Sequence, residues 1–212
     1  MGSLQLDISV SLVDHMGSDL SVVNAARVSF AKKHEEFDNV ADTKLINYLA
    51  KHNHWSPFGH GSMQFAISAP VFVARQLVKH QVGLVWNEVS RRYVDDEPEF
   101  YTPTEWRKLA ENKKQGSSDE TVEYSVKPAY MFAKQSYTNM LKLGIAPEMA
   151  RMVLPQAMMT EWYWSGTLYA FARVCNLRCK PDTQKETQVV GWGIDKHARE
   201  LFPASWKALR DE

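Results

Sequence analysis

The chain has 212 residues, 44% of them hydrophobic and 24% charged, values typical of a globular protein with one domain or two small ones. Lysine plus arginine and aspartate plus glutamate both number 25, so the formal net charge is zero, which argues against a histone-like or tail-driven nucleic-acid binder. Ten glycines and nine prolines are too few for a collagen-like or low-complexity chain.

The hydrophobic pattern of the first half of the chain alternates between period two, typical of half-buried strands, and period 3.6, typical of amphipathic helices. A polar residue or a proline stands where each helix is expected to begin. The expected elements are a strand at 4–12, a helix capped by Ser18, a helix from Asp42 or Thr43 that ends in the histidine-rich stretch 51–60, a strand at 62–68, a helix from Val71 to about His80 with Pro70 in its first turn, and a strand at 85–94.

The second half of the chain continues this mixture. The motif at 102–105 (TPTE) is typical of a capping box with proline at the first helical position, and 112–119 is typical of a surface loop. The expected elements are a helix at 103–111, a long helix from Ala129 that stops at Gly144, a short helix from Pro147 through Val153, a strand at 158–164 broken by Ser165-Gly166, a helix at 167–178 and a helix capped by Asp182. Because strands and helices do not alternate regularly, we expect an α+β fold, a mixed or antiparallel sheet flanked by helices, in one domain over 1–212.

Cysteine usage and hydropathy indicate a soluble, cytoplasmic protein. Cys175 and Cys179 are too few for a disulfide-stapled scaffold, and a CxxxC pair without a second pair is a poor zinc half-site. No apolar run approaches the length of a membrane span, and residues 1–10 lack the basic and apolar regions of a signal peptide. We expect two reduced structural thiols and a protein whose partners include neither membrane nor nucleic acid.

Cationic and amide side chains concentrate between residues 75 and 92. This segment includes Arg75, Gln76, Lys79 and His80, followed by Asn87, Glu88, Ser90, Arg91 and Arg92. A solvated helix face would pair lysine with glutamate at helical spacing, whereas this segment holds a single acid. Arginine makes forked hydrogen bonds to phosphate and carboxylate groups. The segment therefore predicts an anion-binding pocket without specifying its chemistry.

Three histidines surround an expected turn and could in principle bind a metal. They are His52, His54 and His60, around the residues SPF. No cysteine or carboxylate stands nearby at metal-ligand spacing, and the HExxH pattern is absent. We therefore expect surface and packed histidines rather than a metal site.

Other charged groups have ordinary structural interpretations. Glu148 and Arg151 suggest a pair on a helix surface, and Arg173 and Arg178 suggest cations near a helix C-terminus. The motifs GxSxG, GxxxxGK[ST] and GxGxxG are all missing. Local patterns therefore identify no nucleophile and no P-loop or Rossmann nucleotide site.

The segment from Arg75 to Tyr93 resembles the signature of flavin-dependent thymidylate synthases. That signature is RHR, a short spacer and NExSxRY, and its second half is intact here as Asn87, Glu88, Ser90, Arg92 and Tyr93. Six further family motifs lie in the family's order, namely AARVSF (25–30), HWSPFGH (54–60), RQ (75–76), FYTP (100–103), EMARMVLP (148–155) and NLR (176–178). The resemblance covers nearly the whole chain.

The chain departs from the family pattern in three places. Lys79-His80-Gln81 replaces RHR and the following spacer is one residue longer, Gly59 replaces the acid of the SPFEH-type motif, and Thr167 and Tyr169 replace an Asn and an Arg. The anion-binding arginines persist. The resemblance therefore indicates a divergent subgroup rather than a lost function.

The resemblance implies reductive methylation of dUMP to dTMP, with FAD as cofactor and with NADPH and methylenetetrahydrofolate as co-substrates. Reduced flavin supplies the hydride in this family, so no enzymic nucleophile is needed. It also implies a homotetramer whose active sites lie at subunit interfaces. The alternatives are a catalytically impaired homologue that binds dUMP or flavin, and a single-stranded nucleic-acid binder using Arg and Trp, against which the zero net charge argues.

The motifs assign roles position by position. The resemblance implies catalytic roles for Arg178, which would polarise the uracil and favour ionisation at N3, for Ser90 beside the pyrimidine, and for His54. It implies cofactor contacts at Ser29, Ser56, Lys79, His80, Gln81, Glu88, Thr167, Tyr169 and Arg173. It implies substrate contacts at Gln76, Lys79, Glu88, Val89, Ser90, Arg91, Arg92, Arg178 and, from another subunit, Arg151. It implies no metal.

Overall fold

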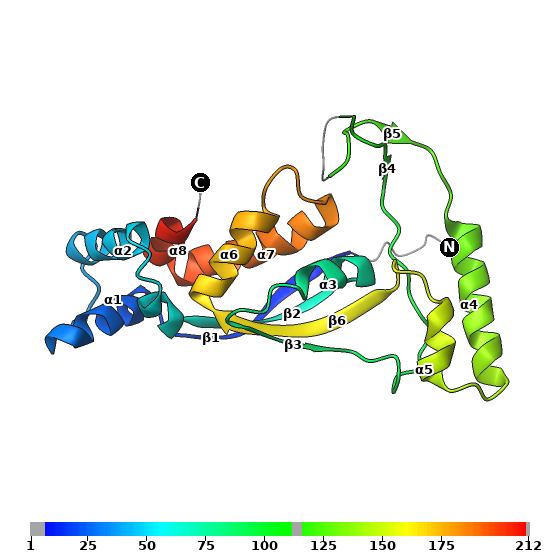
Figure 1. Ribbon diagram of the computed structural model, residues 1–212, viewed down its shortest axis with the longest axis horizontal. Helices are drawn as coiled ribbons and strands as arrows, with labels where there is room; N and C mark the ends of the chain where they lie inside the picture. The colour runs from blue at the N-terminus through cyan, green and yellow to red at the C-terminus, as the bar shows by residue number, and fades with distance from the viewer. Residues whose placement is uncertain (1–6, 112–115, 211–212) are drawn as a thin grey trace.

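The computed structural model describes residues 7–111 and 116–210, and its centre is a four-stranded sheet (Figure 1). Across the sheet the order is β1 (Ser9–Met16), β2 (Ser62–Pro70), β6 (Met159–Thr167) and β3 (Leu84–Glu88), and each neighbouring pair is antiparallel. The expectation of an α+β fold with an antiparallel sheet is confirmed.

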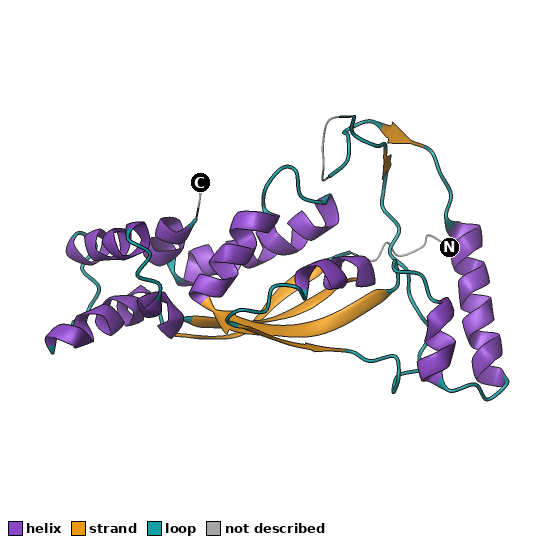
Figure 2. Cartoon of the chain, viewed as in Figure 1, coloured by secondary structure: helices purple, strands orange, loops and turns teal. Residues whose placement is uncertain are grey.

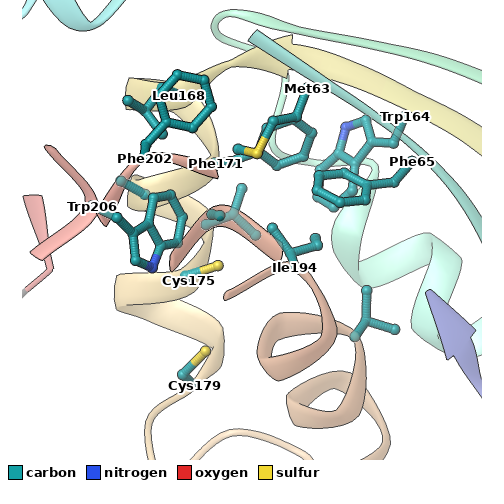
Figure 3. Packing of buried hydrophobic residues seen from close by; sticks show 14 of the residues in the cluster. Met63, Phe65, Trp164, Leu168, Phe171, Cys175, Cys179, Ile194, Phe202 and Trp206 are labelled. Atoms are coloured by element: carbon teal, nitrogen blue, oxygen red, sulfur yellow. The ribbon is translucent and has the colours of Figure 1, made fainter. Parts of the chain in front are cut away.

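One face of the sheet is apolar and covered by helices. Met63, Phe65 and Ile67 of β2 are buried beside Trp162 and Trp164 of β6, because alternate side chains of a strand point to the same face. Three helices lie on this side, namely α3 (Val71–Leu77), α6 (Leu168–Arg178) and α7 (Lys185–Leu201) (Figure 2). Figure 3 shows the resulting core, in which Cys175 of α6 and Cys179 directly after it lie at the packed junction with α7.

Helices gather at both ends of the sheet (Figure 1). One end holds α1 (Asp19–Arg27), α2 (Ala41–Lys51) and α8 (Pro203–Leu209), together with 3-10 turns at Val28–Phe30 and Ser56–His60. The other end holds α4 (Lys127–Lys142), α5 (Pro147–Ala150) with its 3-10 continuation Arg151–Val153, and the hairpin of β4 (Trp106–Arg107) and β5 (Thr121–Val122). The helices beginning near Ser18, Asp42, Ala129 and Pro147 were thus predicted correctly to within two residues.

The prediction of a helix at 103–111 is wrong. Residues 106 and 107 are extended and pair with β5, and the Lys108 N–H donates a hydrogen bond to the Glu120 carbonyl oxygen at 2.9 Å. Trp106 also packs edge-on against Tyr124, with 5.4 Å between ring centroids. These long-range contacts outweigh the local capping signal at 102–105. A loop was expected at 112–119. Its described part, 116–119, belongs to the tip of this hairpin, and 112–115 lie outside the described residues.

The break expected at Ser165-Gly166 is also wrong, because β6 continues through both residues to Thr167. Gly166 pairs with Met63 on one side and Leu84 on the other. A Cβ at Gly166 would overlap the Leu84 Cδ2 atom and would lie 2.5 Å from the Gly83 carbonyl oxygen. Glycine is therefore required at position 166, because the backbone at Gly83 and Leu84 approaches β6 closely.

Several boundaries differ from those expected. The strand expected at 4–12 is described from Ser9 and continues to Met16, with 4–6 outside the described residues, and the strand expected to reach residue 94 ends at Glu88 in a turn. The helix expected to reach His80 ends at Leu77, and Pro70 is the last residue of β2 instead of part of that helix. Helix α7 begins at Lys185 instead of directly after Asp182. Helix α8 was not anticipated. Apart from α8, each of these differences lies at an element end, where tertiary contacts decide the boundary.

Candidate active site

The C-terminal ends of α3 and α6 meet through His80 and Arg178. The Arg178 Nε–H donates a hydrogen bond to the His80 Nε2 atom at 3.0 Å. Burial, followed by the charges of Arg178 and Arg173, lowers the pKa of His80 from 6.5 to about 4. Burial also lowers the pKa of the Arg178 guanidinium. At neutral pH this contact therefore joins a neutral imidazole acceptor to a cationic donor.

A small cavity of about 120 Å³ opens beside this contact. Its walls are formed by Lys79, His80, Gln81, Val82, Leu84, Ala170, Arg173 and Val174. Four expected cofactor contacts therefore share one cavity. Two carry positive charge and one is a neutral imidazole, so the cavity offers hydrogen-bond donors and a field that favours anions.

Arg178 also faces a larger cavity of about 560 Å³. Its walls are formed by Gln76, Arg107, Gly116, Ser117, Arg178, Thr183 and Gln184. The Gln76 Oε1 atom is buried and has no hydrogen-bond partner in the described part of the chain. Two expected substrate contacts, Gln76 and Arg178, are thus brought together with a second guanidinium.

A second group of expected site residues lies in the loop that follows β3. The Glu88 carboxylate accepts hydrogen bonds from Thr160 Oγ1 at 2.9 Å and Trp86 Nε1 at 3.2 Å. The Ser90 Oγ atom accepts from Arg92 Nε at 3.3 Å. Arg91 and Val89 line a cavity of about 600 Å³ that is distinct from the two beside Arg178. His80 precedes β3 and Ser90 follows it, so the two groups lie at opposite ends of this strand.

A third group surrounds the 3-10 turn Ser56–His60. Trp55 and Tyr169 bring their rings to 6.2 Å between centroids, and His54 lies on the exposed surface with its ring 6.0 Å from that of Tyr48. Ser56 is exposed, and Ser29 lies exposed in the turn after α1. The Thr167 Oγ1 atom accepts a hydrogen bond from the Ala170 N–H at 3.2 Å and so caps α6.

A family model described as thymidylate synthase complementing protein matches residues 11–204. The chain belongs to this family. A flavin-dependent thymidylate synthase of Thermus thermophilus is 38% identical over 206 residues, which are 95% of this chain and 75% of that protein. The flavin-dependent thymidylate synthase of Streptomyces avermitilis is 34% identical over 98% of this chain and 92% of its own. The expected family and enzyme class, a methyltransferase, are confirmed.

Solved structures agree with this membership. The UMP/dUMP methylase PolB from Streptomyces cacaoi, bound with 5-Br dUMP, is 33% identical to this chain with a TM-score of 0.84, and the match covers 95% of this chain and 94% of PolB. PolB bound with 5-Br UMP gives a TM-score of 0.79 at 32% identity. The fold of this thymidylate synthase family member is therefore that of a nucleotide methylase.

Sequence motifs did not identify every residue at these cavities. Arg107 and Ser117 come from the hairpin that was expected to begin as a helix, and Thr183 and Gln184 come from the turn before α7. The structure shows that these four residues line the cavity, whereas no local sequence pattern links them to Gln76. The expected Arg151 is exposed, and its Nε–H donates to the Glu148 carbonyl oxygen at 3.3 Å.

Residues 7–111 and 116–210 also bear on metal binding and on membrane insertion. No three His, Cys, Asp or Glu side chains there are grouped in a way that could hold a metal ion. Within the same ranges, no helix has both the length and the apolar composition needed to cross a membrane.

Proposed function

We propose that this chain is a cytoplasmic enzyme that methylates dUMP to dTMP with FAD bound, taking its carbon from methylenetetrahydrofolate and its reducing power from NADPH. The observation that carries the proposal is the placement of Arg178, which contacts the neutral His80 and also lines the cavity of Gln76. A fixed, partly buried guanidinium at a nucleotide cavity is suited to stabilising charge that develops on a uracil ring.

The polar residues of the small cavity suit parts of a flavin nucleotide, although its volume of about 120 Å³ holds only a portion of such a molecule. Lys79 and Arg173 supply positive charge that suits a diphosphate, and the neutral His80 and Gln81 supply polar groups that suit a flavin ring. Trp55 and Tyr169 add an aromatic surface near the turn at 56–60. When bound, reduced flavin supplies the hydride that completes the methyl group.

The role that we assign to Arg178 is electrostatic. Its Nε–H is occupied by His80, which orients the guanidinium and leaves its other N–H groups to face the cavity. Because the group is partly removed from water, its attraction for a developing oxyanion is stronger than in bulk solvent. Arg178 therefore favours the N3-ionised form of the uracil without any covalent bond to the enzyme.

The side chains available for nucleophilic attack support a reaction without an enzymic nucleophile. Cys175 is fully buried, and burial raises the pKa of its thiol. Cys179 is also buried, close to it in sequence. The Ser90 hydroxyl accepts a hydrogen bond from a guanidinium, which lowers its nucleophilicity, and no base contacts it among the described residues. We assign Ser90 to orienting the pyrimidine.

The separation of the site residues supports an active site built by several subunits. Five residues of β3 divide His80 from the loop of Ser90, which corresponds to about 16 Å along a strand. One uracil ring cannot span that length. The open face of the sheet also exposes Val85 and Tyr163. We propose a homotetramer in which the Ser90 loop and Arg151 of neighbouring subunits complete the cavity of Arg178.

The direct test is the visible spectrum of the purified full-length protein together with its turnover. The expected protein is yellow and releases tritium from 5-tritiated dUMP only when NADPH and methylenetetrahydrofolate are both present. Colourless protein that takes up no FAD and turns over no dUMP would refute the proposal. Binding of dUMP in calorimetry without NADPH oxidation would instead support the impaired homologue.

The same assay determines whether the substrate sugar is deoxyribose or ribose. PolB is described as a UMP/dUMP methylase, and its structure is similar to this one over nearly all of both chains. The curated relatives named above are thymidylate synthases, which favours dUMP. We expect tritium release from dUMP to exceed that from UMP at equal concentration, and the reverse order would identify a UMP methylase.

A further inference from the structure

Arg107 occupies the wall between two adjoining cavities. It lines the 560 Å³ cavity with Gln76 and Arg178, and it lines a second cavity of about 280 Å³. The walls of the second cavity include the aromatic side chains of Phe72, Tyr101, Trp106 and Tyr130 and the acidic side chains of Glu105 and Glu186. Arg107 belongs to the hairpin, and its side chain therefore places a positive charge at the wall of the cavity that the proposed reaction uses.

Two hydrogen bonds hold the Arg107 guanidinium. Its Nη2–H donates to the Glu186 Oε1 atom at 2.6 Å, and its Nε–H donates to the Ser117 Oγ atom at 2.8 Å. The Glu186 side chain is 5% exposed and that of Arg107 is 20% exposed, so this ion pair is partly buried. In the described part of the chain, the Nη1 group of Arg107 makes no hydrogen bond to the protein. The guanidinium is therefore fixed, with one end left for another group.

The carboxylate of this pair has a second polar neighbour. Burial first, and then the negative charge of Glu186, raises the pKa of the Tyr101 hydroxyl. A side-chain hydrogen-bonding interaction between the Tyr101 hydroxyl and the Glu186 carboxylate raises this pKa as well. Glu186 therefore interacts with both Arg107 and Tyr101, and these contacts hold its carboxylate beside the guanidinium.

The charge balance of the larger cavity indicates what it binds. Two guanidiniums, from Arg107 and Arg178, line it together with amide and hydroxyl groups, and none of its described lining residues is an acid. A buried ion pair such as Arg107–Glu186 contributes little net stability, so stability alone does not account for it. A preorganised arginine beside a second arginine is suited to a phosphate or carboxylate group.

We propose that Arg107 is a further anion-binding residue of the active site and that Glu186 is its positioning residue. The ligand is the phosphate or carboxylate group of one of the reactants, which could be the nucleotide, the folate or NADPH. This inference rests on the proposed function for the identity of the reactants. The binding of an anion to Arg107 does not require turnover and can be tested separately.

The test uses the full-length, FAD-loaded protein and the variants Arg107→Gln, Arg107→Lys, Glu186→Gln and Arg107→Gln/Glu186→Gln. The matched control is Lys108→Gln, because Lys108 adjoins Arg107 but pairs with the exposed Glu120. The measurements are FAD content, the KM for each reactant, kcat, and calorimetric binding of dUMP and of inorganic phosphate.

Arg107→Gln is expected to raise the KM of one reactant about tenfold or more, which identifies the source of the anion, with FAD content unchanged. Arg107→Lys should restore part of this loss. Glu186→Gln should raise the same KM, and the double variant should lose no more than Arg107→Gln, because Glu186 acts through Arg107.

Three outcomes would overturn the inference. The first is an FAD-loaded Arg107→Gln protein with unchanged KM values and unchanged anion binding. The second is a uniform loss of FAD content and of all affinities, which would show a purely structural pair. The third is additive loss in the double variant. If the wild-type protein were inactive but bound dUMP or phosphate more tightly than Arg107→Gln, the inference would stand while the proposed function failed.

Discussion

Arg178 donates its Nε–H to the Nε2 atom of His80 across 3.0 Å, so the imidazole must carry its proton on Nδ1 and remain neutral. The two residues come from distant parts of the chain and meet where α3 and α6 end. Protonation of His80 would place a second cation against the guanidinium, which together with burial is why its pKa falls to about 4. The contact therefore couples the charge state of His80 to the geometry of Arg178.

The first prediction concerns stability against pH. The pKa of His80 is about 4 in the folded chain, below its ordinary value of 6.5, so the unfolded chain binds more protons between these values. The free energy of unfolding should therefore fall as the pH is lowered from about 6.5 to about 4. His80→Gln, which keeps an acceptor for Arg178, should flatten this dependence in urea unfolding. The exposed His15→Gln is the control, and an unchanged slope in His80→Gln would contradict the assignment.

The second prediction concerns catalysis by Arg178. Arg178→Ala should fold and bind FAD, and its kcat for dTMP formation should fall by about 10²-fold or more, the usual effect of removing one charge-stabilising donor. Tritium release from labelled dUMP measures the change. Lys180→Ala, which removes an exposed cation two residues away, should retain wild-type turnover. Near-normal activity in Arg178→Ala would refute its role.

The third prediction concerns the junction of β6 and β3. Gly166→Ala should lower the free energy of unfolding by about 1–3 kcal/mol, because the added methyl group overpacks the sheet. The new Cβ would lie 2.5 Å from the Gly83 carbonyl oxygen, and a backbone atom cannot move aside cheaply. Gly59→Ala is the matched control, since its Cβ would meet only Trp55, at an ordinary 3.7 Å. Equal stability of the two variants would show that the sheet relaxes freely.

The fourth prediction concerns the buried pair that joins α1 to α2. Arg27 Nη1 lies 2.6 Å from Asp42 Oδ1, and Asp42 has no exposed surface. Asp42→Ala would leave the Arg27 charge unpaired in a mostly buried position, so it should cost about 3–5 kcal/mol in urea unfolding. The exposed Glu35→Ala, which loses only its surface pair with Lys33, should change stability by less than about 1 kcal/mol. A small effect of Asp42→Ala would show that water replaces the carboxylate.

Local patterns predicted much of the fold. The alternation of Met63, Phe65 and Ile67 placed β2, and the glycine at 144 marked the end of α4, because side-chain period and backbone conformation are properties of neighbouring residues. The hairpin of β4 and β5 was not predicted, because it depends on pairing between residues that are distant in the sequence. Trp106 is extended because it pairs with Val122, and no short-range pattern records that pairing.

For the candidate site, too, the residue types were predictable from the sequence and their arrangement in space was not. By itself the sequence determined the family, through the motif from Asn87 to Tyr93, and it determined which arginines and histidines to expect. Only the tertiary structure decided that Arg178 contacts His80, that Gln76 and Arg178 share a cavity with Arg107, and that the Ser90 loop lies at the other end of β3. The physical reason is that residue types follow from the chemistry they must perform, whereas their distances depend on how separate elements pack.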